Sequence, residues 1–267
     1  MPDIYPSVPD YQVEFFTDQP PHQDLVFIFV FNESDKLRKQ LERFPPPEER
    51  TYDIMIGDDG STDGSSDPDI LKAYGVRGTV TLEHNSGLST NIRAGLHWFT
   101  QDTAYASVIM MNGNNKDDPG AIPRFQEKLH SGLDYVQGSR FMPGGSMRNT
   151  PMLRHYAIRL MHAPLFSLAA GSWMTDTTNG YRAFSRTFLT SDQVFPFQSC
   201  FRAYEIEQYL AWKAIRLNYR HDEINVARDY PTPAARGKGA SISKIKPGTG
   251  YWLMLKPLIA LLLRWYK

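Results

Sequence analysis

The sequence contains a single cysteine, Cys200, among its 267 residues. A chain with one cysteine forms no internal disulfide, which excludes the small disulfide-stabilised secreted scaffolds and fits a reducing compartment. Residues 1–15 have neither a basic stretch nor an apolar stretch, so we expect no signal peptide. These absences predict a cytoplasmic location.

An excess of charge of either sign is also absent. The chain has 29 Lys and Arg residues and 29 Asp and Glu residues, so its formal net charge is zero. Nucleic-acid-binding domains usually carry a basic surplus, so we expect no nucleic-acid partner. The hydrophobic content of 41% and the length permit a large core, which excludes a disordered chain.

No apolar run is long enough to cross a membrane as a helix. The longest candidate is the amphipathic C-terminal segment 251–267, which Lys256 and Pro257 interrupt. Its tryptophans Trp252 and Trp265, with nearby basic residues, suit a membrane interface. Its leucines equally suit a core helix. The first interpretation predicts peripheral contact with the inner face of the membrane, and both remain open.

Apolar runs alternate along the chain with segments of helical spacing. A continuous run of β-formers such as 25–31 is typical of a buried parallel strand. The alternation predicts an α/β fold with a mostly parallel central sheet and helices on both faces. Residues 1–24, rich in proline and polar side chains, are expected to form an extended arm. The expected strands are 25–31, 52–56, 78–85, 106–111, 134–140 and 221–230, and the expected helices are 33–44, 88–100, 120–132, 152–171 and 203–219.

Four of the expected strands end in polar segments, at 32–33, 57–59, 112–116 and 139–140. In open α/β sheets, ligands bind outside the carboxyl ends of the strands. The convergence of four polar segments at one edge therefore predicts a binding site there. The segment DDGSTDGS at 58–65 has glycines for tight turns and carboxylates that accept hydrogen bonds from a nucleobase or ribose. It lacks the spacing of a dinucleotide fingerprint and the lysine of a P-loop.

Seven motifs follow one another in an order that resembles the family 2 glycosyltransferases, and most of all their dolichol/polyprenyl-phosphate mannosyltransferase-like branch. This resemblance implies a GT-A (nucleotide-diphospho-sugar transferase) fold over 25–250, with a nucleotide-binding half at 25–140 and an acceptor-side half at 141–250. It also implies inverting transfer from a nucleotide-sugar to a lipid-linked or polysaccharide acceptor in cell-surface glycan synthesis. The motifs are FVFNES (29–34), GDDGSTDGS (57–65), HNSGL (84–88), NGNNKDDP (112–119), VQGSRF (136–141), DTTNGYRAF (176–184) and SISKI (241–245).

The resemblance assigns roles to individual residues of this chain. Phe29 and Phe31 stand where the branch usually has proline and tyrosine, and Ile158 stands where a serine is expected. The residues expected to bind the donor are Phe29, Phe31, Glu33, Asp58, Asp59, Asn112, Gly113, Asn114, Lys116 and Arg140. The residues expected to contact the acceptor or its phosphate are Arg154, Arg182 and Lys244, and the candidate catalytic carboxylates are Asp176 and Glu205.

The two candidate carboxylates also have structural interpretations. Glu205 opens an expected helix, where a negative charge is favoured by the helix dipole, and Asp176 equally suits a structural cap. A hydroxyl acceptor needs a general base, usually Asp or Glu, whereas a phosphate acceptor is already an anion. The sequence alone does not show whether Glu205 and Asp176 are catalytic or structural.

The 112–116 loop departs from the family at the metal site. Asn112 and Asn114 stand at the positions of two metal-binding aspartates, and Lys116 stands where a glutamine helps to hold the metal. Hard cations prefer carboxylates, and an amide lacks their charge. One lysine at about 4 Å from a phosphate charge supplies roughly 4 kcal/mol at an effective dielectric near 20. We therefore do not predict a required cofactor. If Mn²⁺ or Mg²⁺ binds, we expect it to bind weakly, at Asn112 and Asn114.

Two other functions remain as alternatives. The amides of the 112–116 loop also fit a catalytically silent, nucleotide-binding partner of an active transferase. A nucleotidyltransferase shares this sheet architecture, but the expected glycine- and lysine-rich loop after the first strand is missing. In the enzyme interpretation, the basic loop 236–246 is expected to close over the donor diphosphate.

Overall fold

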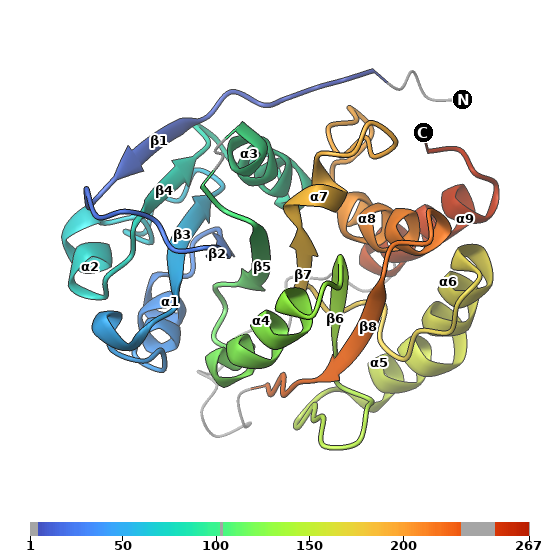
Figure 1. Cartoon of the computed structure of the whole chain (residues 1–267). Helices are drawn as coiled ribbons and strands as arrows, with labels where there is room; N and C mark the ends of the chain where they lie inside the picture. Colours follow the sequence, from blue (N-terminus) through green and yellow to red (C-terminus); the bar gives the residue numbers. More distant parts are fainter. Residues whose placement is uncertain (1–4, 102–103, 231–248, 267) are drawn as a thin grey trace.

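A computed structural model describes residues 5–101, 104–230 and 249–266 of the chain. Lys244 and the loop 236–246 lie outside the described residues. The described part forms an eight-stranded sheet in the order β1-β4-β3-β2-β5-β7-β6-β8 (Figure 1). The strands are β1 (Gln12–Phe15), β2 (Asp24–Val30), β3 (Tyr52–Asp58), β4 (Gly78–Thr81), β5 (Ser107–Asn112), β6 (Tyr135–Ser139), β7 (Arg182–Ser185) and β8 (His221–Asn225).

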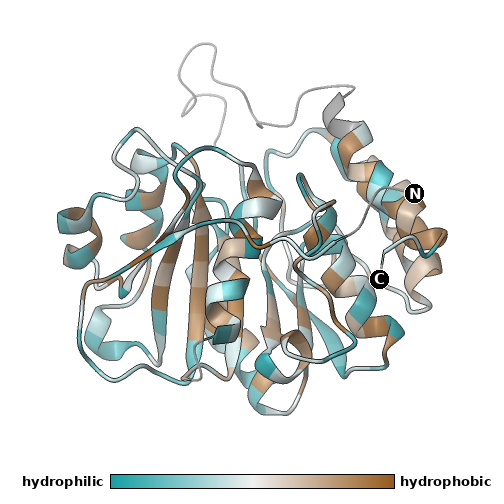
Figure 2. Ribbon diagram, turned by 90° about the horizontal axis from the view of Figure 1, so that it is seen from above, coloured by the Kyte–Doolittle hydropathy of each residue, from teal (hydrophilic) through white to brown (hydrophobic). Residues whose placement is uncertain are grey.

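The sheet is mostly parallel, as predicted, with antiparallel pairing only at β1 and β7 within the described residues. β2 lies at its centre, between β3 and β5, and all seven of its residues are buried. This explains why the run at 25–31 is apolar throughout rather than alternating. Figure 2 shows the hydrophobic residues concentrated on these inner strands.

Helices cover both faces of the sheet. Phe27 and Phe29 of β2 join a core with α3 and α8, whereas Val26 and Ile28 join a second core with α1, α2 and α4. The helices are α1 (Ser34–Leu41), α2 (Pro68–Ala73), α3 (Leu88–Gln101), α4 (Ile122–His130), α5 (Met152–Ala157), α6 (Ala163–Ala170), α7 (Arg186–Leu189), α8 (Glu205–Arg216) and α9 (Thr249–Leu262), with 3₁₀ turns at Pro47–Glu49 and Pro119–Ala121 and a π-helical turn at Ile158–His162.

The segment predicted as an extended arm is joined to the rest of the fold along its length, by strand pairing and by separate hydrogen bonds. Residues of β1 pair with β4 at the edge of the sheet. Further towards the N-terminus, the amide of Ser7 donates to the carbonyl of Phe197 at 2.7 Å, and the amide of Ser199 donates to the carbonyl of Tyr5 at 3.0 Å. The arm therefore runs across the molecule from the loop before α8 to the far edge strand (Figure 1).

The helix expected at 152–171 is interrupted by the π-helical turn between α5 and α6. It ends at Gly171, as the glycine predicted, with a left-handed φ of 83°. The π turn carries His162 into the interior, where its Nδ1 lies 2.7 Å from the hydroxyl of Thr177. Such turns inside helices are frequent near functional sites.

The C-terminal helix α9 packs into the core, as one of the two interpretations expected, and the membrane contact stays a prediction. Leu258 and Leu261 are buried in the core that includes α8. In contrast, Trp252 and Leu263 are more than half exposed, at 57% and 54%. The helix is therefore apolar on its core face and on part of its outer face. No helix among the described residues is both long and apolar enough to span a membrane.

Candidate active site

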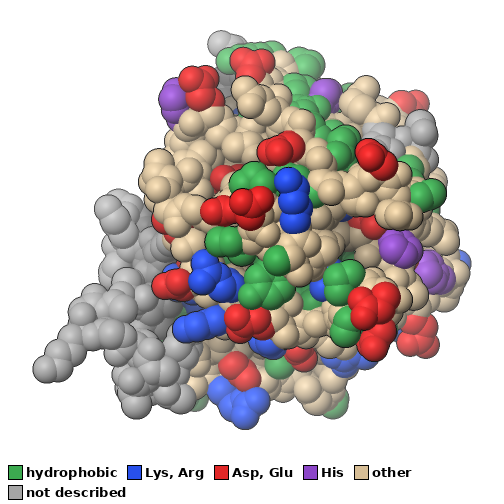
Figure 3. Space-filling view, turned by 90° about the vertical axis from the view of Figure 1, so that its left-hand side faces the viewer, with side chains coloured by type: hydrophobic (Ala, Val, Ile, Leu, Met, Phe, Trp, Pro, Cys, Tyr) green, Lys and Arg blue, Asp and Glu red, His purple; other side chains and the backbone are tan. Residues whose placement is uncertain are grey.

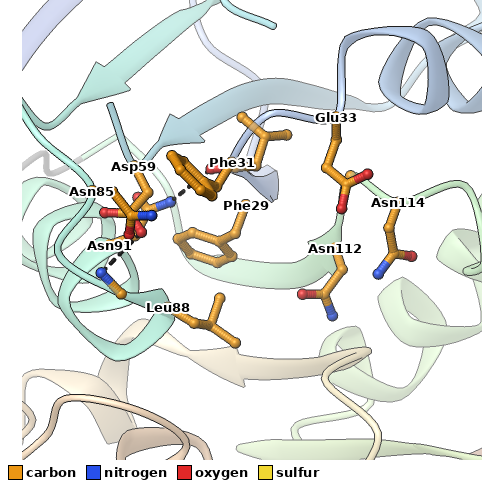
Figure 4. A pocket seen from close by; sticks show the side chains of 12 residues that line it. Phe29, Phe31, Glu33, Asp59, Asn85, Leu88, Asn91, Asn112 and Asn114 are labelled. Atoms are coloured by element: carbon orange, nitrogen blue, oxygen red, sulfur yellow. Dashed lines mark hydrogen bonds between the residues drawn. The ribbon is translucent and has the colours of Figure 1, made fainter. Parts of the chain in front are cut away.

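The carboxyl ends of β2, β3 and β5 meet as the sequence predicted. Phe29 of β2 is opposite Gly57 of β3 on one side and Asn112 of β5 on the other. Beyond these ends lies a pocket of about 200 Å³ (Figure 4). It is lined by Phe29, Val30, Phe31, Glu33, Asp59, Asn85, Gly87, Leu88, Asn91, Asn112, Gly113 and Asn114.

The pocket has an apolar middle and two polar ends. Figure 4 shows the rings of Phe29 and Phe31 near Leu88, with Asp59 and two asparagines at one end and Glu33, Asn112 and Asn114 at the other. The Phe29 ring stacks on Phe27 with centroids 4.8 Å apart, which fixes its orientation. This arrangement suits a flat aromatic group in the middle and a polar group at each end.

Asp59 organises the end of the pocket that faces β4. Its buried carboxylate accepts hydrogen bonds from the backbone amides of Ser86, at 2.7 Å, and Gly87, at 2.9 Å. Burial raises the pKa of Asp59, and these two amides counteract part of that rise. Asp59 thus lines the pocket and also holds the loop that supplies Asn85 and Leu88.

Asp58, in contrast, does not line the pocket that it was predicted to form. It is buried, and its carboxylate accepts from the Ser61 amide at 3.0 Å, the Ser61 hydroxyl at 2.5 Å and the Ser66 hydroxyl. These bonds close the tight turn of the DDGSTDGS segment. The structure therefore gives Asp58 a role in shaping the loop.

Sequence reasoning missed Asn91 of α3, which forms part of the pocket lining. Its side-chain amide donates to the carbonyl of Gly57 at 2.8 Å and to that of Val30 at 3.4 Å. Its Oδ1 atom is buried without a hydrogen-bond partner among the described residues. The signal in the sequence was a polar residue on the buried face of a helix directly after HNSGL. Asn91 joins the ends of β2 and β3 and leaves one acceptor beside the pocket.

Asn112 and Asn114 enter the pocket on a loop that is clamped from two sides. The carboxylate of Asp117 accepts the Asn112 amide at 3.2 Å and forms a buried ion pair with Arg228. From α1, Gln40 accepts the Asn115 amide at 2.8 Å, and Arg43 beyond the helix donates to the Asn115 side chain at 3.1 Å. The acidic residues of the loop are thus engaged within the protein. In the described part of the chain, no group of three His, Cys, Asp or Glu side chains is placed to hold a metal.

Lys116 is the last residue of the 112–116 loop and does not line the pocket. Its ammonium is 4.3 Å from the centre of the Tyr230 ring, and the guanidinium of Arg154 lies over the same ring at 5.8 Å. Burial lowers the pKa of Lys116 to about 8, with help from the positive charges of Arg228, Arg154 and Lys36. Lys116 and Arg154 therefore belong to a concentration of positive charge next to the amide loop.

Arg140 and Asp176 pair with each other in the interior. The two side chains are 1% and 0% exposed, with Nε to Oδ2 at 2.6 Å and Nη2 to Oδ1 at 2.8 Å. Burial alone would raise the pKa of Asp176, but Arg140 outweighs it and the pKa is lowered. Arg140 was predicted to bind a phosphate and Asp176 to be catalytic. In the structure each group is the partner of the other, and both roles stay predictions.

Arg182, which was expected to contact the acceptor, is also buried in the interior. It is 1% exposed and donates to the carbonyls of Glu207, at 2.6 Å, and Asn179, at 2.5 Å. These bonds hold the start of α8 against the loop that precedes β7. Both terminal nitrogens of Arg182 thus donate to the protein itself, and the expected acceptor contact stays a prediction.

Glu205, the other candidate catalytic carboxylate, is buried at the start of α8. Its Oε2 atom accepts from the backbone amides of Arg202, at 3.0 Å, and Ala203, at 2.6 Å. The structural interpretation of this residue therefore fits better than the catalytic one.

Glu207, two residues further on, was missed by sequence reasoning. A β-carbon added to Gly180 would lie 2.8 Å from Oε1 of Glu207 and 2.7 Å from the side-chain nitrogen of Asn112, so these two groups approach each other over a glycine. Burial raises the pKa of Glu207, and the charge of Arg182 counteracts this. Glu207 is thus the carboxylate of α8 that lies beside the pocket loop.

The family comparison agrees with this geometry. The model of "Glycosyl transferase family 2" matches residues 25–207, which include the pocket and the start of α8. The chain belongs to glycosyltransferase family 2. The silent-partner alternative is not favoured, and the protein is a glycosyltransferase.

Similar family 2 proteins include bacterial enzymes named for polyprenyl phosphates. The polyprenol monophosphomannose synthase of Mycolicibacterium smegmatis is 27% identical over 214 residues, 79% of this chain and 78% of the relative. The undecaprenyl-phosphate mannosyltransferase of Micrococcus luteus is 27% identical over 204 residues, 76% of this chain and 82% of the relative. The predicted resemblance to the polyprenyl-phosphate mannosyltransferase-like branch is confirmed.

Solved structures show the same fold. Glucosyl-3-phosphoglycerate synthase from Mycobacterium tuberculosis, in complex with Mn²⁺, UDP and phosphoglyceric acid, has a TM-score of 0.63 and 19% identity. The match covers 91% of this chain and 78% of that one. The predicted GT-A fold is therefore confirmed.

Proposed function

We propose that this glycosyltransferase moves a sugar, with inversion, from a nucleotide-sugar to a lipid-linked phosphate acceptor in cell-surface glycan synthesis. The observation that carries the proposal is the state of the two predicted catalytic carboxylates. Asp176 is bound to Arg140, and Glu205 is bound to two backbone amides. A hydroxyl acceptor requires a general base, but a phosphate acceptor is already a nucleophilic anion. The names of the two polyprenyl-phosphate relatives support the same acceptor class.

The shape of the pocket supports a nucleotide as the donor. The apolar middle, with Phe29, Phe31 and Leu88, suits the faces of a nucleobase. The diphosphate would then extend towards Asn112 and Asn114, near the positive charge of Lys116. Attack on the sugar from the side opposite the leaving diphosphate inverts the anomeric carbon.

The residues at the diphosphate end are a poor fit to a tightly held divalent metal. Asn112 and Asn114 carry no charge, and Asp117 is already paired with Arg228. Hard cations prefer carboxylate oxygens that are not already bound to a cation. We therefore infer that Lys116 supplies the positive charge that a metal supplies elsewhere, and that any Mn²⁺ or Mg²⁺ at the two amides is weakly held.

The test of the proposed function is transfer to a prenyl phosphate, assayed with UDP-, GDP-, CDP- and dTDP-sugars. We expect one donor class to support transfer, with product of inverted configuration by NMR. Glu207→Gln should keep turnover within about threefold, whereas loss of a required general base costs about 10²–10⁴-fold. Absence of transfer with every donor, or a large loss in Glu207→Gln with a hydroxyl acceptor as the better substrate, would contradict the proposal.

A second part of the proposal is contact with a membrane surface, where lipid-linked acceptors lie. Exposed apolar side chains gather around α5, α6 and α9, with Arg159, Lys256 and Arg264 exposed among them. Figure 3 shows a different surface over α1, α2 and β1, with acidic and basic side chains interspersed. Large exposed apolar patches mark interaction sites. The exposed apolar residues around α5, α6 and α9, which we call the membrane face, are Met152, Leu153, Tyr156, Leu160, Met161, Leu168, Trp173, Trp252, Leu253, Ile259, Leu262, Leu263 and Trp265.

We expect the double variant Trp252→Asp/Leu263→Asp to reduce sedimentation with anionic liposomes at least tenfold. Burial of each such side chain is worth about 1.5–3 kcal/mol, and both are exposed, so folding should be preserved. Phe15→Asp on β1, exposed on the opposite edge strand, is the matched control. Deletion of 251–267 is less informative, because Leu258 and Leu261 are buried. A folded double variant that sediments like wild type would exclude this face as the membrane contact.

A further inference from the structure

A second pocket, of about 270 Å³, lies beside α5 and the π-helical turn. The residues that give it its chemistry are Phe141, His155, Tyr156, Arg159, Leu160 and Trp173. It is therefore lined mostly by aromatic and aliphatic groups, with two basic side chains. We call it the aromatic pocket.

The aromatic pocket is on the same edge of the sheet as the first pocket, which Phe29, Asp59 and Asn112 line and which is proposed to bind the nucleotide. Phe141 follows shortly after the carboxyl end of β6, and Asn112 is the last residue of β5. β5 and β6 run in the same direction with only β7 between them, so their ends are about 10 Å apart. A phosphate on an elongated molecule in the aromatic pocket is thus within reach of the donor sugar.

Of the two basic side chains of the aromatic pocket, Arg159 is exposed and His155 is half-buried, unlike the fully buried Arg140 and Arg182. Arg159 is exposed, with its guanidinium 5.6 Å from the centre of the Phe141 ring, and it has no carboxylate within 4 Å among the described residues. His155 is four residues earlier on the same helix face and packs edge-on against Phe141 at 5.3 Å. Arg140 and Arg182 are bound in the interior. Arg159 is therefore better placed than either of them to bind a phosphate at the aromatic pocket.

From this arrangement we propose that the aromatic pocket binds the phosphate and the first two isoprene units of a prenyl phosphate acceptor. The inference rests on the proposed function and identifies where its acceptor is held. Arg159 would bind the phosphate, and Phe141, Leu160 and Trp173 would contact the chain. A cavity of about 150 Å³ accommodates benzene, so one of 270 Å³ accommodates roughly ten carbon atoms, or two isoprene units.

The surface around the aromatic pocket fits a longer chain that continues outwards. Leu160 and Trp173, at its rim, are 74% and 66% exposed. Leu160 is in the π-helical turn that directly follows α5, and α5 carries Met152 and Leu153 of the proposed membrane face. The distal chain would therefore pass from the aromatic pocket into the lipid without crossing a polar surface.

Calorimetry with the full chain and water-soluble acceptors tests this inference. We expect geranyl phosphate, with two isoprene units, to bind at least tenfold more tightly than dimethylallyl phosphate, with one, and inorganic phosphate to bind weakest. Trp173→Ala should abolish the difference between the two prenyl phosphates. Arg159→Gln should weaken both about tenfold and keep their ratio. Phe15→Ala, which removes an exposed aromatic ring from β1, should bind like wild type.

A folded Trp173→Ala protein that keeps the wild-type preference for geranyl phosphate would overturn the assignment. Equal binding of inorganic and geranyl phosphate would do so as well, since the pocket would then recognise a free anion. A transfer assay on the same proteins separates this inference from the proposed function. Binding as expected without transfer would contradict the function alone, and transfer with unaltered binding in both variants would contradict the pocket alone.

Discussion

Lys116→Ala is expected to lower turnover about 100-fold and to change the Kd of the nucleotide-sugar little. Negative charge builds on the departing diphosphate as the glycosidic bond breaks, so a positive group there stabilises the transition state more than the bound donor. Removing one group that stabilises such charge typically costs 10²–10³-fold in turnover. In the structure the Lys116 ammonium lies over the Tyr230 ring, a contact worth about 0.5–2 kcal/mol.

The controls for Lys116 are a neighbouring lysine and a chelator. Lys36 is 56% exposed and contributes to the same positive region, so Lys36→Ala should retain turnover within a few-fold. EDTA should leave wild-type transfer largely intact, because a lysine is not removed by chelation. Activity that is lost in EDTA and restored by Mn²⁺ would show that Asn112 and Asn114 act as metal ligands and that Lys116 has another role.

The pH dependence of kcat/KM provides an independent readout of the same group. The pKa of Lys116 is lowered to about 8, so the charged form predominates below this pH. Since the charged form is the active one, kcat/KM should fall as pH rises through about 8. Lys116→Arg keeps its charge to much higher pH, so the decline should disappear or move upwards in that variant.

Much of the donor side was predictable because it depends on the central parallel strands. The run 25–31 is apolar throughout, so β2 and its neighbours are identified with little ambiguity. Once they are parallel, their carboxyl ends share one edge, and Phe29, Asp59 and Asn112 must lie close together. Asn91 was missed because its one signal, a polar residue on the buried face of a helix, does not by itself show whether the side chain lines a pocket or only bonds to the backbone.

The acceptor side was harder to predict because its geometry depends on short elements. β7 has only four residues and runs antiparallel, so the sequence around 173–186 gave no strand pattern. A motif indicates which residues are present but not whether Arg140 and Asp176 face a ligand or each other. Glu205 and Glu207 differ by two residues, or about 200° around a helix, so they lie on opposite sides of α8, and the motif alone does not show which side faces the pocket.

The interior pair of Arg140 and Asp176 leads to the largest expected effect on stability. Asp176→Ala should destabilise the fold by about 3–5 kcal/mol, because it leaves the Arg140 guanidinium buried without its partner. Arg140→Ala should be similarly harmful, and the double variant should lose less than the sum of the two, because neither charge then remains uncompensated. Urea denaturation of the four proteins measures these free energies of unfolding.

The dependence of this stabilisation on pH follows from the carboxylate. The pKa of Asp176 is lower in the folded protein than its ordinary value. Its contribution should therefore be complete at neutral pH, above the pKa of the unfolded chain, and should decline as pH falls through the lowered folded value. The difference in unfolding free energy between wild type and Asp176→Ala should shrink in acid. Single variants as stable as wild type at neutral pH, but without transferase activity, would instead make Asp176 a catalytic residue and return a general base to the mechanism.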